Sequence, residues 1–299
     1  MKLGYIGLGK MGGNMVERLL EKRHGVVAFD RNADAMTAAK NKGAQTADTL
    51  AELVAAVSSP RLVWIMVPYQ AVDAVLKELT PLLAKGDTVV DGGNSPFKES
   101  IRRSKELEAG CIDFLDAGVS GGPAGARSGA CIMVGGRKEV FLKFEGLFRD
   151  LAVSDGYGYM GMAGAGHFVK MVHNGIEYGM MQALAEGFAV MKASDFGLEL
   201  ARITDVYNHR SVIESRLVGW LQSAFEQYGE DLKDITGSDA QSGEGMWTVE
   251  SGKELGVATP VIQAALDFRI QSQARPGYVG KLISAMRNQF GGHDVKEKK

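Results

Sequence analysis

Near its start the chain reads Gly7-Leu8-Gly9-Lys10-Met11-Gly12, and this stretch decides the fold. The apolar run Leu3–Ile6 precedes it and the helical pattern Met11–Lys22 follows it. A Gly-x-Gly-x-x-Gly loop between a strand and a helix is typical of dinucleotide-binding domains, because it lets a pyrophosphate approach the backbone at the positive end of the helix. Glycine is common in the chain, at 39 residues, so a turn that merely needs glycine is the alternative.

The choice of cofactor depends on the residues after the second expected strand. Asp30 ends the apolar run that begins at Val26, and its carboxylate can accept hydrogen bonds from ribose hydroxyls while it repels a 2′-phosphate. Arg31 has the opposite effect if it binds that phosphate, and it is otherwise a solvated surface charge. The pattern therefore favours NAD as the cofactor, with NADP as the less favoured alternative.

Short apolar runs alternate with helical patterns through the first half of the chain, which predicts a parallel sheet covered by helices. The expected strands are Leu3–Ile6, Val26–Asp30, Leu62–Val67, Thr88–Asp91, Ile112–Ala117, Ala130–Val134 and Ala152–Tyr157. From Gly164 onward the patterns are helical, beginning with a long helix over Ala165–Ala193. We therefore expect an α/β fold, with a Rossmann-type doubly wound sheet followed by an all-α C-terminal domain. The expected bounds are a dinucleotide-binding domain at 1–160, a helical domain at 161–290 and a C-terminal tail at 291–299.

The composition points away from nucleic-acid and membrane partners. The chain of 299 residues is 45% hydrophobic and has a net charge of -2, whereas a nucleic-acid-binding domain is usually strongly basic. Charged residues interrupt the apolar stretch Met160–Ala193, so we expect no membrane span there. Cys111 and Cys131 lie in apolar runs, and we expect two reduced thiols in the core of a cytoplasmic protein.

Two loops rich in small residues follow expected strands. Asp91-Gly92-Gly93-Asn94-Ser95 comes at the carboxyl end of one strand, where ligands bind in doubly wound sheets. Asn94 could bind a ligand there, or it could cap the helix that follows. The stretch Gly118–Gly129, which contains Ser120, would let a carboxylate or phosphate approach the backbone, with a flexible linker as the alternative.

A polar stripe runs along the long apolar helix. Lys170, His173, Asn174 and Glu177 share one face at helical spacing, and Tyr178 lies beside them. A buried Lys–Glu ion pair is one explanation, although such pairs are weak evidence for stability. Four convergent polar groups beside a nucleotide-binding domain indicate an active site instead.

At these residues the chain resembles the 6-phosphogluconate dehydrogenase family of the β-hydroxyacid dehydrogenase superfamily. The helix reads Lys170-Met171-Val172-His173-Asn174, where small-acid enzymes of the superfamily typically read K-x-x-N-N. Asp91–Ser95 and the pair Glu177-Tyr178 are also typical of the family. The segment Arg287–His293 resembles the family's R-D-Y-F-G-A-H, and Arg269 matches a phosphate-binding arginine. The chain is shorter than the family's long forms and is similar to the short, NAD-preferring branch.

This resemblance implies the roles of the site residues. Lys170 and Glu177 are the implied catalytic residues. The implied substrate contacts are Asn94, Ser120, Gly121, Gly122, His173, Asn174, Tyr178, Arg269, Arg287 and His293. We expect NAD to contact Gly7, Leu8, Gly9, Lys10, Met11, Gly12, Asp30, Arg31, Met66, Val67, Pro68 and Asn94, and we expect no metal. The helical domain would serve substrate binding and dimerisation, in a homodimer or homotetramer that supplies Arg287 and His293 in trans.

The implied reaction is the oxidative decarboxylation of 6-phospho-D-gluconate to D-ribulose 5-phosphate and CO2 with reduction of NAD. Some residues depart from the family pattern: Ser242 and Glu244 stand where the long forms have lysine and threonine, and Pro123 and Ala124 replace an acidic pair. One alternative is a non-decarboxylating β-hydroxyacid dehydrogenase acting on 3-hydroxyisobutyrate or tartronate semialdehyde. A nucleotide-sensing protein without activity is another, although a sensor would not need Lys170 and Glu177.

Overall fold

The structure is a computed structural model that describes residues 1–238 and 243–295. It divides into two compact units, Met1–Met171 and Val172–Lys299, called here the N-terminal and C-terminal units. The division falls inside helix α8 (Ala165–Lys192), which begins in the first unit and continues in the second. The boundary expected near residue 160 stays a prediction.

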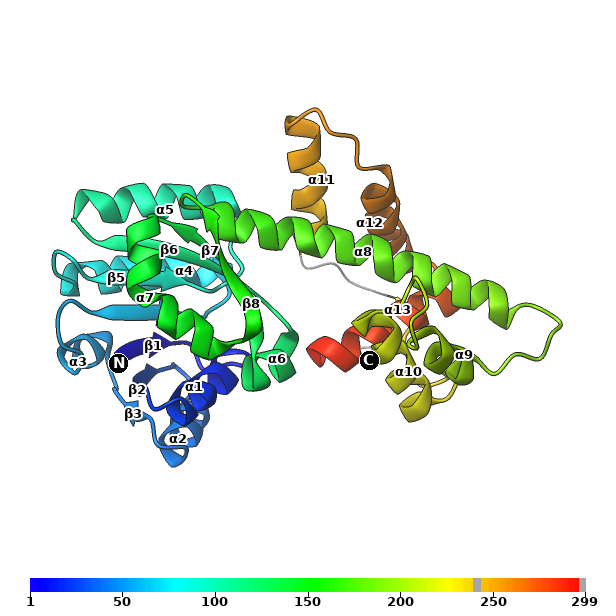
Figure 1. The fold of residues 1–299 in the computed structure, drawn as a ribbon, viewed down its shortest axis with the longest axis horizontal. Coiled ribbons are helices and arrows are strands. Elements are labelled where there is room, and N and C mark those ends of the chain that lie inside the picture. The colour runs from blue at the N-terminus through cyan, green and yellow to red at the C-terminus, as the bar shows by residue number, and fades with distance from the viewer. Residues whose placement is uncertain (239–242, 296–299) are drawn as a thin grey trace. The chain divides into compact units, whose positions relative to one another are not determined.

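One eight-stranded sheet forms the centre of the N-terminal unit (Figure 1). Its strands in spatial order are β3 (Gln45–Thr46), β2 (Gly25–Phe29), β1 (Lys2–Ile6), β4 (Leu62–Ile65), β5 (Thr88–Asp91), β6 (Asp113–Ser120), β7 (Ala130–Gly136) and β8 (Ala152–Gly161). The pairs are parallel except for β6 and β7, which are antiparallel. The Rossmann-type sheet is confirmed, and the predicted parallel pairing holds for β1, β2, β4, β5 and β6. Only the step from β6 to β7 reverses the strand direction among the pairs described. The segment between Ser120 and Ala130 is too short for a parallel crossover, which takes a dozen or more residues.

Helices cover both faces of this sheet. They are α1 (Gly12–Glu21), α2 (Ala33–Asn41), α3 (Leu50–Ala55), α4 (Tyr69–Leu79), α5 (Phe97–Ala109), α6 (Gly122–Ser128) and α7 (Lys138–Leu151), with a 3-10 turn at Thr80–Leu82. Side-chain caps explain two of the starts, because Asn32 accepts from the amides of α2 and Thr49 from an amide of α3. Helix α6 was not among the expected helices, since Gly-rich sequence favours turns over helix.

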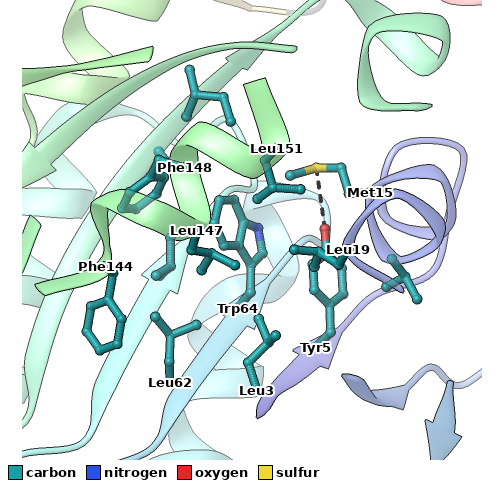
Figure 2. Close-up of a cluster of buried hydrophobic side chains, with 14 of the residues drawn as sticks. Leu3, Tyr5, Met15, Leu19, Leu62, Trp64, Phe144, Leu147, Phe148 and Leu151 are labelled. Carbon is teal, nitrogen blue, oxygen red and sulfur yellow. Dashed lines mark hydrogen bonds between the residues drawn. The ribbon is translucent and has the colours of Figure 1, made fainter. Parts of the chain in front are cut away.

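The apolar core lies in two layers, one on each face of the sheet. In the layer under α1 and α7, the Trp64 ring stacks on Tyr5 with ring centroids 6.2 Å apart, and Phe148 packs against its other side (Figure 2). The Tyr5 hydroxyl donates to Met15 Sδ, and complete burial raises the pKa of this tyrosine. This packing holds β1 and α1, and therefore the glycine loop between them, in one rigid arrangement.

The described part of the C-terminal unit is helical, in agreement with the expected all-α domain. After α8 its helices are α9 (Leu200–Tyr207), α10 (Arg216–Tyr228), α11 (Glu244–Glu254), α12 (Pro260–Ser272) and α13 (Tyr278–Gly291). A core around Phe188, Leu221 and Met286 joins α8, α10 and α13. Val295 is buried in this core and its carbonyl accepts from the Thr236 amide, so the described part of the tail packs on its own unit.

Both cysteines are free thiols, as expected, but neither lies in the core. Cys111 lies in the turn before β6 with φ 57°, Cys131 lies in β7, and both are exposed and unpaired. The apolar runs around them led to the wrong placement. Cys111 lies in the turn that interrupts its run, and Cys131 is the exposed second residue of a strand whose other residues are buried. No helix in the described ranges 1–238 and 243–295 combines the length and the apolar character that crossing a membrane requires.

Candidate active site

The glycine loop between β1 and α1 has three glycines with different surroundings. Gly7 has φ 99°, and a Cβ atom there would lie 2.4 Å from the Met66 carbonyl oxygen. A Cβ atom at Gly12 would lie 2.0 Å from the Gly7 carbonyl oxygen. At Gly9, by contrast, a Cβ atom would have no described atom within 4 Å. Protein packing thus requires the first and third glycines, while the second faces open space where a ligand can approach.

Asp30 joins this loop to the end of β2. Its Oδ2 atom accepts from the Leu8 amide at 2.6 Å, and its Oδ1 atom accepts from the Asn32 amide at 2.8 Å. A cavity of about 470 Å³ opens beside these groups. Its lining consists of Leu8, Gly9, Lys10, Gly13, Asn14, Asp30, Asn32, Ala35, Ala38 and Lys42. Arg31 is exposed and does not belong to this lining.

The loops after β1, β4 and β5 meet at the carboxyl edge of the sheet. A Cβ atom at Gly93 would lie 2.5 Å from the Val67 carbonyl oxygen, and one at Gly92 would lie 2.9 Å from Met66 Sδ. Asn94, the next residue, has φ 54°. The structure therefore places Met66 and Val67 next to Gly7 of the glycine loop and next to the Gly92-Gly93 turn that precedes Asn94.

A buried ion pair supports the loop that carries Asn94. Asp91 accepts from the Gly93 amide, the Ser95 hydroxyl and the Arg103 guanidinium, at 2.9, 2.8 and 3.0 Å. Arg103 also donates to Ser95 Oγ. Pro96 is the N-cap residue of α5, and ligand binding and helix capping both stay predictions for Asn94.

The Ser120-Gly121-Gly122 segment is ordered and not a flexible linker. Ser120 is the last residue of β6, Gly121 has φ 121°, and α6 begins at Gly122 with φ 61°. Both glycines have backbone angles that other residues rarely adopt. Arg127 of α6 forms ion pairs with Glu17 and Glu21 of α1, so this segment is attached to the helix that follows the glycine loop.

Lys170 lies against the sheet on the second turn of α8. It is 6% exposed, and a Cβ atom at Gly118 of β6 would lie 2.4 Å from Lys170 Cβ. Burial of an ammonium group is costly without strong partners, so a buried lysine at this edge is a candidate for chemistry. Gly118 is thus the residue whose lack of a side chain makes room for Lys170.

The rest of the polar stripe lies in the C-terminal unit. His173 Nδ1 is 3.0 Å from Asn174 Oδ1 and 3.9 Å from Glu177 Oε2. The His173 and Glu177 side chains are 37% and 24% exposed, so both are half-buried and still reach solvent. The helix confirms that these side chains share one face.

Tyr178 and Arg269 form one compact group in the C-terminal unit. The Arg269 guanidinium lies 3.4 Å from the centre of the Tyr178 ring, and both residues are buried. A Cβ atom at Gly245 would lie 2.5 Å from the same ring, so α11 packs closely against α8 there. Cation–π contact holds the guanidinium in a fixed plane, which suits binding of an anion along its edge.

Arg287 and His293 belong to α13 and the residues after it. Arg287 is 9% exposed, whereas His293 is exposed and packs edge-on against Phe290 with ring centroids 6.3 Å apart. Phe290 in turn packs against Trp220 of α10. Ser242 lies outside the described residues, and Glu244 is the buried first residue of α11.

A second buried polar group was not expected from the sequence. Asp116 of β6 accepts from the Gly164 and His167 amides at 2.6 and 2.8 Å, and the His167 ring is 2.7 Å from Ser100 Oγ. Burial raises the pKa of Asp116, although His167 and the two amides oppose that shift. A carboxylate inside the apolar run Ile112–Ala117 was the available signal.

Within residues 1–238 and 243–295, no group of three or more His, Cys, Asp or Glu side chains is arranged to hold a metal ion. The candidate groups described above are therefore backbone amides, one buried lysine, half-buried polar side chains and arginines. Such groups suit a dinucleotide and an anionic substrate.

Two sequence profiles match this chain. The profile of the NAD binding domain of 6-phosphogluconate dehydrogenase matches residues 2–161, and that of the 6-phosphogluconate dehydrogenase C-terminal domain matches residues 166–279. The chain belongs to the 6-phosphogluconate dehydrogenase family. It is therefore related to oxidoreductases, and its first domain is of the nicotinamide-dinucleotide-binding type.

Relatives within this family are of two lengths. A Haloferax volcanii protein named as NAD(+)-dependent, decarboxylating 6-phosphogluconate dehydrogenase is 43% identical and matches over 100% of this chain and 99% of its own. A Bacillus subtilis protein, provisionally named a 6-phosphogluconate dehydrogenase, is 48% identical over the whole of both chains. The human decarboxylating enzyme is 36% identical over 97% of this chain but only 64% of its own. The chain thus corresponds in length to the short relatives.

Solved structures agree with this family assignment. The Plasmodium falciparum 6-phosphogluconate dehydrogenase superposes with a TM-score of 0.81 at 29% identity, over 91% of this chain and 62% of that one. A Mycobacterium tuberculosis 3-hydroxyisobutyrate dehydrogenase superposes with a TM-score of 0.76 at 20% identity, over 96% and 99%. The second likeness shows only that the fold is shared across a wider set of enzymes.

Proposed function

We propose that this protein catalyses the oxidative decarboxylation of 6-phospho-D-gluconate to D-ribulose 5-phosphate and CO2 with reduction of NAD. The observation that carries the proposal is the polar face of α8, on which buried Lys170 and half-buried Glu177 are seven residues apart. A proton acceptor and a separate proton donor are what this reaction needs, and they occur here in a chain of the 6-phosphogluconate dehydrogenase family.

The N-terminal unit fits NAD. Gly9 faces open space beside the start of α1, and Asp30 lines the adjacent cavity with its carboxylate held by backbone amides. We propose that the amides of the glycine loop bind the pyrophosphate and that Asp30 accepts from the adenosine ribose. Met66–Pro68 and Asn94, which lie in the loops after β4 and β5, would line the nicotinamide half. The Haloferax relative is named as NAD(+)-dependent, whereas the Plasmodium enzyme was studied with NADP+.

The proton transfers are proposed for two residues. NAD, when bound, would supply the hydride acceptor for C3 of the substrate. Neutral Lys170 would accept the proton of the C3 hydroxyl as the hydride leaves C3. Lys170, now cationic, then donates a proton to the C3 oxygen while C1 leaves as CO2 and negative charge develops on that oxygen. Glu177 gives a proton to the former C2, which is C1 of the product, while Lys170 takes back the proton of the C3 oxygen, and the enediol becomes the ketose.

The remaining site residues would hold the substrate. Ser120, Gly121 and Gly122 would bind its carboxylate end, and His173, Asn174 and Asn94 its hydroxyls. Tyr178 and Arg269 would bind the phosphate, since a stacked guanidinium presents its donors in one plane. Arg287 and His293 of a neighbouring subunit would complete the phosphate site in a homo-oligomer.

A substrate panel tests the proposal. Purified protein is given 6-phosphogluconate, 3-hydroxyisobutyrate or D-glycerate, each with NAD and with NADP, and the reduced cofactor is measured. We expect the largest kcat/KM with 6-phosphogluconate and NAD. Turnover of 3-hydroxyisobutyrate or glycerate without turnover of 6-phosphogluconate would overturn the assignment. The Lys170→Ala variant is the control: it should bind NAD normally while its kcat falls by several orders of magnitude.

A further inference from the structure

The start of α8 is held by a carboxylate from the sheet. Asp116 of β6 is completely buried, and its two oxygens accept from the Gly164 amide at 2.6 Å and the His167 amide at 2.8 Å. The first amides of a helix have no acceptor within the helix, and they carry the positive end of its dipole. A strand residue therefore performs for α8 the capping that a local Ser, Thr or Asn usually performs.

The same strand also determines where Lys170 lies. Gly118 follows Asp116 by two positions, so both point to the same face of β6. A Cβ atom at Gly118 would lie 2.4 Å from Lys170 Cβ, and one at Gly166 would lie 2.6 Å from the Asp116 carbonyl oxygen. Helix and strand are thus in backbone contact, and β6 fixes the first turns of α8 at two successive points.

Helix α5 extends this support to the Asn94 loop. Its Ser100 hydroxyl lies 2.7 Å from Nδ1 of His167, and both side chains are buried. One turn later, Arg103 pairs with Asp91 and Ser95, which precede and follow Asn94. One helix therefore contacts both the start of α8 and the loop proposed to bind the nicotinamide end of the cofactor.

We propose that Asp116 is a positioning residue for Lys170. Its bonds to the Gly164 and His167 amides set the axial position and rotation of the first turns of α8, and so the place from which Lys170 reaches the C3 hydroxyl. Stability alone would not need a carboxylate here, because burying its charge is costly. The inference rests on the proposed role of Lys170 as proton acceptor. A displacement of about 1 Å at a reacting group can lower a rate about 100-fold.

The test compares three variants with the wild type. Asp116→Asn keeps the shape of the side chain, but its single amide oxygen can accept a hydrogen bond from only one of the two backbone amides. Gly118→Ala leaves Asp116 intact, but its added Cβ atom would overlap Lys170 Cβ and displace that residue. Asp113→Asn is the matched control, since Asp113 is on the same strand and pairs with Arg137 at the protein surface. For each variant we would measure kcat, KM, the Kd of NAD, and amide hydrogen exchange in residues 164–171.

For Asp116→Asn and Gly118→Ala we expect kcat to fall about 10- to 100-fold, while the Kd of NAD is unchanged and the protein stays folded. Exchange in residues 164–171 should accelerate in Asp116→Asn and stay normal in Asp113→Asn. Wild-type kcat in a folded Asp116→Asn protein, or unchanged exchange in that segment, would overturn the proposal. Wild-type protein that is inactive on 6-phosphogluconate would contradict the proposed function instead, and the exchange measurement would still decide the role of Asp116.

Discussion

No side chain in the described part of the protein requires glycine at position 9, whereas the glycine at position 12 has no room for anything larger. Substitutions at these two glycines should therefore have different effects, on ligand binding at Gly9 and on folding at Gly12. We expect Gly9→Ala to keep the melting temperature of the wild type and to raise the KM for NAD, because the added methyl group would meet the pyrophosphate. Gly12→Ala should lower the melting temperature, because its Cβ atom would overlap the Gly7 carbonyl. Equal effects of both variants on stability would show that Gly9 is a structural glycine.

Asp30 is the residue to which the cofactor preference is attributed. Its carboxylate lines the cavity beside the glycine loop, whereas Arg31 is exposed outside that lining. In Asp30→Asn the repulsion of a 2′-phosphate is lost, so the ratio of kcat/KM for NAD to that for NADP should fall by about tenfold or more, which corresponds to ~1.4 kcal/mol. Arg31→Ala is the companion variant and should reduce use of NADP only. An unchanged ratio in Asp30→Asn would remove Asp30 from this role.

At the scale of elements, α5 carries two neighbouring arginines in opposite surroundings. Arg103 is 1% exposed and pairs with buried Asp91, whereas the Arg102 side chain is 40% exposed and pairs with surface carboxylates. Removing one partner of a buried pair leaves an uncompensated charge, so Arg103→Met should lower the free energy of unfolding by about 3–5 kcal/mol. Arg102→Met should cost at most about 1 kcal/mol. Similar losses in chemical denaturation of the two variants would contradict this account.

The spacing of apolar and polar residues predicted those helices and strands that are long enough to show a periodic pattern of their own. The polar stripe from Lys170 to Glu177 has helical spacing, and α8 contains all of it. The two-residue strand β3 is too short for a periodic pattern and forms by pairing with β2. Helix α6 is rich in glycine and begins at glycines with positive φ, so its sequence resembles a turn. The cap of α8 by Asp116 could not be predicted either. It depends on a strand and a helix about fifty residues apart in sequence meeting in space.

At the scale of the whole molecule, we propose that the segment Arg287–His293 contributes to the active site of a neighbouring subunit. His293 is exposed, while the chain around it is anchored through Phe290 and Val295. If His293 acts in trans, a mixed dimer of Lys170→Ala and His293→Ala contains one intact site and one doubly defective site. A random mixture should then recover about a quarter of wild-type activity, since half of its dimers are mixed. No recovery after co-expression of the two variants would place His293 in the site of its own chain.

In the proposed reaction one active site couples oxidation at C3 to the loss of C1, and labelled substrate tests this coupling. Protein is incubated with NAD and 6-phosphogluconate carrying labelled carbon at C1, and released CO2 and NADH are measured together. The account predicts one CO2 for each NADH, with ribulose 5-phosphate as the other product. NADH formed without labelled CO2 would contradict it and would indicate a dehydrogenase that does not decarboxylate its product.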